Sequence, residues 1–216
     1  MLRNLFSTGF NLQSIIFVLI RVLVILLAIS VHEMSHGFAA YKLGDKTAKY
    51  DGRLSLNPLR HLDPFGALCM LLFGFGWAKP VMVNPMYFKN HKRDLALTAL
   101  GGPVSNFLMA YFGMFGLLYL VPILNNVYLY YFFMSFIMIN LGLGVFNLIP
   151  VPPLDGSKIF LSLLPRKIYY EIMRYERYGF IVLIVALYLG VIDPILDFFV
   201  NNIYTLLFYA AGGGLF

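Results

Sequence analysis

Residues 95–154 contain no charged side chain, and this uncharged segment limits most strongly what the chain can fold into. A helix that crosses a bilayer needs about 20 consecutive apolar residues. The segment is long enough for two such helices, and the turn-forming sequence VPILNNV at 121–127 divides it into predicted spans near 95–120 and 127–149. The whole chain is 60% hydrophobic and 12% charged, whereas about 25% of the residues of a soluble domain are charged. The sequence therefore predicts a protein that lies in a membrane.

Further apolar segments lie on both sides of this region. Residues 11–43 are typical of one long helix, residues 178–192 form another apolar run, and residues 195–216 either cross the membrane or lie at its surface. We expect an all-α polytopic membrane protein with four to six membrane segments, built as a single domain over residues 1–216. The alternating sequence near residues 77–88 predicts, in addition, a short membrane-associated strand or hairpin.

The basic residues gather in a few loops. The net charge is +6, and residues 42–60, 89–93 and 158–177 are rich in Lys and Arg, while the turn at 121–127 is uncharged. Membrane proteins place such basic loops on the cytoplasmic side, so the charge is explained by topology and we expect no nucleic-acid partner. We predict a multi-pass integral protein of a bacterial cytoplasmic membrane whose first helix runs from the outside to the cytoplasm.

The first long helix contains the sequence His32-Glu33-x-x-His36. Residues i and i+4 share one face of a helix, so His32 and His36 can bind one zinc ion through imidazole nitrogens. Glu33 then lies close enough to take a proton from the attacking water and return it to the leaving amine. A chance match, or two buried histidines with other partners, is the alternative reading. Because such groups are costly within a membrane helix and mark functional sites, we predict one zinc ion per chain, toward the cytoplasmic side.

A catalytic zinc site usually has three protein ligands, and Asp155 is our candidate for the third. It is the one carboxylate that interrupts the apolar C-terminal half before the last basic loop. It follows three prolines in NLIPVPPLDG at 147–156, and irregular backbone at membrane depth is tolerated where it lines a wet cavity. Alternatively, Asp155 caps a helix that begins near Ser157. The competing ligands lie in or beside polar loops or a short apolar segment: Cys69, His61 and His91.

These motifs resemble those of the site-2 protease family of intramembrane zinc metalloproteases. The metal-binding pattern at 32–36 is followed by GGPVSN at 101–106 and by NLIPVPPLDG at 147–156, in that order. Residues 52–66 (GRLSLNPLRHLDPFG) and 76–85 (GWAKPVMVNP) also resemble segments of the family.

The resemblance extends over the core motifs at 30–160 and implies a minimal form of the family, without a PDZ or CBS domain. It implies His32, His36 and Asp155 as the zinc ligands and Glu33 as the catalytic acid and base. It also implies hydrolysis of a peptide bond in or near a transmembrane segment of a membrane-protein substrate. Such cleavage serves regulated intramembrane proteolysis or the clearance of signal-peptide remnants.

Two single amides interrupt the apolar spans, Asn106 and Asn147. Each is a candidate to donate hydrogen bonds to the substrate backbone or to the oxyanion that forms on attack. Each has the alternative role of a polar contact between membrane helices, which is common for Asn in membranes.

The segment WAKPVMVNP at 77–85 is a candidate to hold the substrate in an extended conformation. It alternates as a strand does, and its two prolines confine it to the edge of a sheet. An exposed strand edge can pair with an extended peptide. A plain surface loop between two spans is the alternative. The residues proposed for this contact are Lys79, Val81, Val83 and Asn84.

Two other functions fit parts of the sequence. A catalytically inactive relative would bind transmembrane partners without cleaving them, but it would not need Glu33. A transporter could use His32, Glu33 and Asp155 as a proton or metal relay, but transporters often contain inverted repeats and we find no internal repeat.

Overall fold

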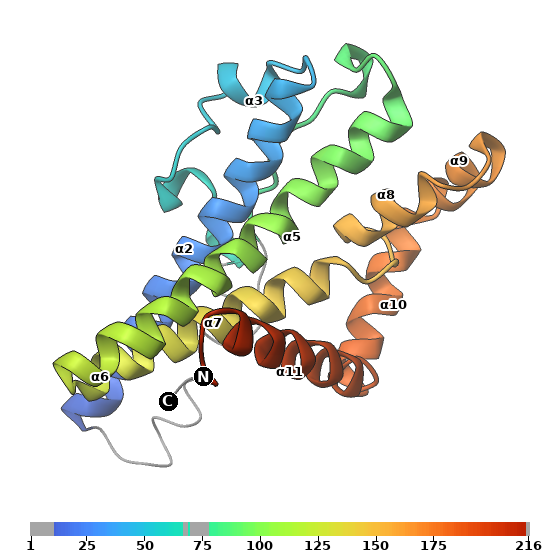
Figure 1. The fold of residues 1–216 in the computed structure, drawn as a ribbon. Helices are drawn as coiled ribbons and strands as arrows, with labels where there is room; N and C mark the ends of the chain where they lie inside the picture. The colour runs from blue at the N-terminus through green and yellow to red at the C-terminus, as the bar shows by residue number, and fades with distance from the viewer. Residues whose placement is uncertain (1–10, 67–68, 70–77, 215–216) are drawn as a thin grey trace.

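The computed structural model describes residues 11–66, 69 and 78–214. In this part of the chain all regular elements are helical, as the composition predicted, and no sheet is present (Figure 1). In chain order the elements are α2 (Leu12–Lys42), α3 (Thr47–Tyr50), η1 (Pro58–Arg60), η2 (Pro85–Tyr87), α5 (His91–Phe115), the π-helical turn η3 (Gly116–Leu120), α6 (Val121–Leu124), α7 (Val127–Asn147), α8 (Asp155–Leu161), α9 (Arg166–Arg174), α10 (Glu176–Tyr188) and α11 (Asp193–Ala210).

Helix α2 begins and ends where its sequence predicts. The side chain of Asn11 caps it by accepting a hydrogen bond from the backbone of Gln13, as Asn commonly does at this position. The helix ends at Lys42, and Gly44 follows with a φ of +110°, a conformation that favours glycine. The 31 residues between these signals are long enough to cross a membrane.

The uncharged region folds into two antiparallel helices. Helices α5, η3 and α6 follow one another to Leu124, and a turn at Asn125 and Asn126 leads into α7. Asn125 adopts a left-handed conformation with a φ of 42°, and the side chain of Asn126 caps α7. The predicted turn at 121–127 is therefore present, with its two asparagines at the reversal of the chain.

Three of the described helices are long and apolar enough to cross a membrane: Leu12–Lys42, His91–Leu124 and Val127–Asn147. Helices α10 and α11 make a fourth span if they count as one, although they are bent by 82° relative to each other. At the bend, Gly190 follows the end of α10 with a φ of +67°, and Pro194, which cannot continue a preceding helix, lies in the first turn of α11. The described residues thus provide three or four membrane segments, at or below the lower end of the predicted four to six.

Helices α2, α5 and α7 pack against one another, and α11 lies against α7 (Figure 1). The core between α5, α7 and α11 is apolar. Between α2 and α5, small residues bring the helices close together. At Gly101, for example, a Cβ atom would lie 2.9 Å from the backbone oxygen of Ser35. On the outer faces large apolar side chains such as Leu19 and Phe112 remain exposed, as expected for helices that contact lipid.

The predicted hairpin near residues 77–88 is wrong for the part of it that the structure describes, residues 78–88. This part makes a single antiparallel bridge, between Leu62 and Ala78, and then forms the short helix η2. The proline at the start of η2 and Pro80 cannot donate backbone hydrogen bonds, which a paired strand needs. The backbone amides of Val81 and Asn84 instead donate to carboxylates, as described below.

Candidate metal centre

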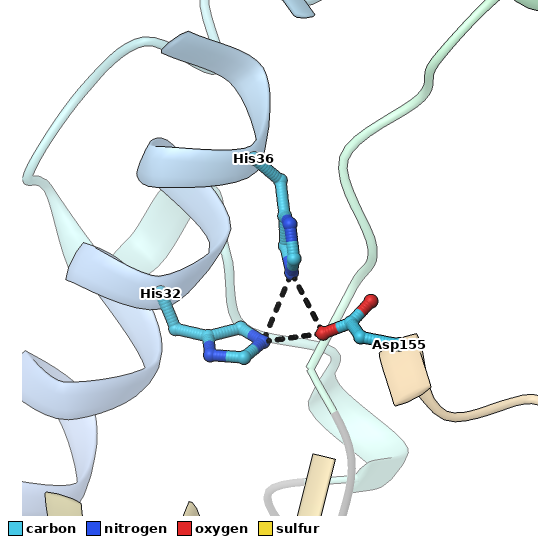
Figure 2. A group of neighbouring side chains, drawn as sticks. All are labelled: His32, His36 and Asp155. Atoms are coloured by element: carbon cyan, nitrogen blue, oxygen red, sulfur yellow. Dashed lines mark hydrogen bonds and ion pairs between the residues drawn. The ribbon is translucent and has the colours of Figure 1, made fainter. Parts of the chain in front are cut away.

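His32 and His36 lie one turn apart on α2, and both side chains point to the same side of the helix (Figure 2). They are buried, with 5% and 8% of their surfaces exposed. Their Nε2 atoms are 3.0 Å apart. The helical spacing therefore brings two potential metal ligands to one point, as the motif predicted.

Asp155 reaches the same point from the other half of the chain. Its Oδ2 atom lies 3.3 Å from the Nε2 of His32 and 3.0 Å from the Nε2 of His36 (Figure 2). Helix α7 ends at Asn147, and the proline-containing loop that follows places Asp155 at the first residue of α8. Leu154 occupies the capping position of α8, and no side chain caps this helix. The alternative role of Asp155 as a helix cap is therefore wrong, and its carboxylate faces the two histidines instead.

The other ring nitrogens show which atoms of the histidines are available. The Nδ1 of His32 is 2.6 Å from the side-chain oxygen of Asn106, and the Nδ1 of His36 is 2.8 Å from the backbone oxygen of Thr98. Both partners are hydrogen-bond acceptors, so each Nδ1 carries a proton and each Nε2 presents its lone pair. Two lone pairs 3.0 Å apart beside a carboxylate repel one another unless a cation lies between them.

The three donor atoms fit a zinc ion. With metal–ligand distances of 2.0–2.2 Å, neighbouring ligands of a tetrahedral zinc are about 3.3 Å apart, close to the separations of 3.0 to 3.3 Å found here. Gly102 of α5 leaves the space that the two imidazoles occupy, because a Cβ atom there would overlap the Nε2 of His36 and lie 2.5 Å from the Cε1 of His32. The donor set of two imidazoles and one carboxylate is also one that catalytic zinc sites use.

Glu33 lies on the wall of a cavity of about 350 Å³ beside these ligands. His36, Asp155 and Lys158 also line it. The Oε2 of Glu33 accepts a hydrogen bond of 3.0 Å from the backbone N–H of Val81. This bond holds the carboxylate of Glu33 next to the open space in which a substrate and water could meet.

The four residues proposed to hold the substrate lie at different distances from this cavity. Val81 and Val83 line it, together with Pro80 and Met82 between and beside them. Lys79 does not, and its backbone N–H donates to the backbone oxygen of His61. Asn84 does not either; its backbone N–H donates to the buried carboxylate of Asp45, and its side chain caps η2.

The two asparagines have different positions. Asn147 lines the cavity, and its amide nitrogen donates to the backbone oxygen of Leu143. Asn106 is fully buried behind His32, outside the cavity, and also donates to the side-chain oxygen of Asn140. For Asn106 this geometry favours the alternative of a contact between helices over a direct contact with substrate.

The competing ligands stay apart from the site. Within the described residues one group of His, Cys, Asp and Glu side chains is close enough to hold a metal ion, and it consists of His32, His36 and Asp155. The Nε2 of His61 faces the backbone oxygen of Ser55, and His91 is the first residue of α5. Three residues near the ligands were not predicted from the sequence: Asn140, Thr98 and Lys158. Thr98 contributes a backbone oxygen, which no sequence pattern signals, whereas Asn140 is a single amide in an apolar span like the two that were noticed.

Comparison with known proteins agrees with this geometry. The model of peptidase family M50 matches residues 121–189. The protein named "Putative zinc metalloprotease YwhC" of Bacillus subtilis is 43% identical over 175 residues, which are 76% of this chain and 78% of that protein. Proteins named "Putative zinc metalloprotease Rip2" are 26% identical over 172 residues in Mycolicibacterium smegmatis and 30% identical over 138 residues in Mycobacterium tuberculosis, covering 64% and 52% of those proteins. No solved structure matches the chain. The chain is thus an integral membrane zinc metalloprotease and belongs to peptidase family M50, the site-2 protease family.

Proposed function

We propose that this metalloprotease is an intramembrane endopeptidase that hydrolyses a peptide bond in or near a transmembrane segment of another membrane protein. The position of the metal ligands in a membrane-spanning helix carries this proposal. His36 lies six residues before the end of α2 at Lys42, which corresponds to about 9 Å at the rise of an α-helix. A substrate helix in the bilayer is within reach of a site at this depth, whereas a soluble protein is not.

The charge pattern supports a site on the cytoplasmic side of a bacterial cytoplasmic membrane. The C-terminal end of α2, which carries the ligands, leads into the basic region 42–60, and α8 leads into the basic region 158–177. Both ends therefore face the cytoplasm by the positive-inside rule. The loop that begins after Asn147 is irregular, and such backbone admits water at membrane depth.

The residues around the cavity have complementary roles in the proposed reaction. Zinc held by His32, His36 and Asp155 supplies a Lewis acid that favours attack by water on a carbonyl group. Glu33 takes the proton of the attacking water and returns it to the amine nitrogen that leaves. Because Asn147 lines the cavity, we propose that its amide hydrogen-bonds to the peptide group that reacts.

Substitution of Glu33 by Gln tests this proposal. The amide oxygen of Gln can still accept the hydrogen bond from Val81, so the change removes proton transfer and little else. We expect Glu33→Gln to keep zinc and to lose cleavage of a transmembrane substrate in liposomes by about 10²- to 10⁴-fold. Asp155→Ala should lose zinc and cleavage together.

Three outcomes would contradict the proposal, the first for the role of Glu33 and the other two for the function itself. Equal cleavage by wild type and Glu33→Gln would show that Glu33 is not the catalytic base. Zinc-loaded wild type that binds transmembrane segments but cleaves none would be an inactive relative, and zinc or proton flux across the liposome without cleavage would identify a transporter.

A further inference from the structure

Asn140 is a fully buried amide in the middle of α7, and the reaction proposed above does not use it. It does not line the catalytic cavity. Its side chain nevertheless belongs to a chain of hydrogen bonds that leads to the metal site. The Nδ2 of Asn140 donates to the backbone oxygen of Phe136 at 2.8 Å, and its Oδ1 accepts from the Nδ2 of Asn106 at 2.8 Å. The Oδ1 of Asn106 in turn faces the Nδ1 of His32 at 2.6 Å.

The direction of this chain is determined at its far end. A backbone oxygen can only accept, so Asn140 must turn its NH₂ group toward Phe136 and its oxygen toward Asn106. Asn106 must then turn its NH₂ group toward Asn140 and its oxygen toward His32. A longer contact of 3.5 Å from the same NH₂ group to the backbone oxygen of Ala28 agrees with this orientation. With an oxygen at 2.6 Å, the Nδ1 of His32 has to carry the proton.

We propose that Asn140 is a positioning residue of the metal centre, which acts through the amide of Asn106 to hold His32 in the tautomer whose Nε2 can bind zinc. The inference rests on the zinc site described above and assigns it a partner on a third helix, α7. His36 needs no such partner, because a backbone oxygen, that of Thr98, already determines its tautomer. Substitution of a residue that orients a metal-binding histidine typically weakens metal binding by about 10- to 100-fold.

A purely structural role for Asn140 is the alternative, since buried amides also join membrane helices without any effect on chemistry. The two roles differ in how they depend on position 106. Orientation of Asn106 requires an acceptor at position 140 and changes zinc affinity only while residue 106 is an amide, whereas the effect of a polar contact on helix packing does not depend on the tautomer of His32.

The test is the zinc dissociation constant of the full-length protein in detergent, measured by competition with a chromophoric chelator. Asn140→Leu keeps the volume and removes the acceptor, and we expect it to weaken zinc binding about tenfold or more. Asn140→Asp keeps the acceptor and should bind zinc within about threefold of wild type, well below the 10- to 100-fold range. Asn140→Ala replaces the leucine variant if that variant does not fold.

Asn202 provides a matched control. On α11 its Nδ2 donates to the backbone oxygen of Phe198, one turn earlier, as that of Asn140 does to Phe136, but Asn202 is exposed and no chain of amides leads from it to the metal site. Asn202→Leu should therefore bind zinc as wild type does.

A double substitution separates orientation from packing. Asp at position 106 presents an oxygen to His32 whichever way it turns, so Asn140 no longer matters for the tautomer. In the Asn106→Asp background, adding Asn140→Leu should leave zinc affinity unchanged. The proposal is overturned if Asn140→Leu binds zinc as tightly as Asn202→Leu, or if it weakens zinc binding equally with Asn and with Asp at position 106.

Discussion

For each ligand of the proposed zinc site, the neighbouring groups determine which atom can bind the metal. Both histidines present Nε2 because oxygen acceptors occupy the Nδ1 side, and Asp155 approaches because it caps no helix. The remaining requirement is empty space, and Gly102 supplies it. In this protein the histidine pair can converge with Asp155 because α5 carries no side chain at position 102.

Gly102→Ala should abolish zinc binding while the helices stay folded. The added methyl group would overlap the Nε2 of His36, so the imidazoles would have to leave the positions in which they converge with Asp155. Metal analysis of the purified protein measures this loss. Gly142→Ala on α7 is the matched control, because a Cβ atom there meets no other atom within 4 Å, and it should retain zinc. Full zinc occupancy in Gly102→Ala would mean that the metal lies elsewhere.

At the scale of an element, we predict two roles for the segment 78–84, one toward Glu33 and one toward the substrate. Its Val81 amide is already bonded to Glu33, whereas the amides of Met82 and Val83 have no partner among the described residues. An extended substrate could therefore pair with the second part of the segment while Val81 continues to hold Glu33. We therefore expect Val81 to hold Glu33 and Val83 to contact the substrate, whereas the sequence predicted substrate contact for both.

Val83→Pro should lower cleavage without loss of zinc. The substitution removes one backbone donor, and a hydrogen bond contributes about 1 kcal/mol, or about fivefold in rate. The effect should be largest for a substrate whose transmembrane helix is stable, because that helix has to be held unwound. The internal control is the same substrate with glycines that weaken its helix. Equal kinetics of variant and wild type on both substrates would exclude pairing at Val83.

At the scale of the whole molecule, the charges of the loops predict one orientation in the membrane. Regions 42–60 and 158–177 lie at or beyond the ends of helices that carry the metal ligands. The uncharged turn at 121–127, which contains α6, leads from α5 into α7 at the opposite end of these helices. From the positive-inside rule we predict that both basic regions lie on the cytoplasmic side.

Cysteine labelling of intact cells tests this orientation. Lys49 and Asn125 are both exposed, so Lys49→Cys and Asn125→Cys can each be made in a Cys69→Ser background and treated with a reagent that does not cross membranes. We expect the reagent to label position 125, and position 49 only after the cells are opened. Labelling of position 49 in intact cells, with position 125 protected, would reverse the topology.

Local sequence determined the long helices and two of the three metal ligands. The length of each apolar run, the cap at Asn11 and the turn at Asn125 depend on neighbouring residues, so the long helices were predictable. The spacing of His32 and His36 is also local, since one helical turn separates them. Asp155 was predicted from its place in the apolar C-terminal half and from the family resemblance, but its distance from the histidines depends on how α8 lies against α5.

Tertiary structure alone decided the features that depend on contacts between distant segments. The segment near Val81 alternates like a strand, yet its amides donate to the carboxylates of Glu33 and Asp45 on or next to α2, and residues 78–88 form no hairpin. Asn140 is separated from its partner Asn106 by 34 positions, and in the sequence it looks like any single polar residue in a membrane helix. One amide can determine the orientation of the next only when three helices bring these side chains into contact. The periodicity of a single helix does not predict such contacts.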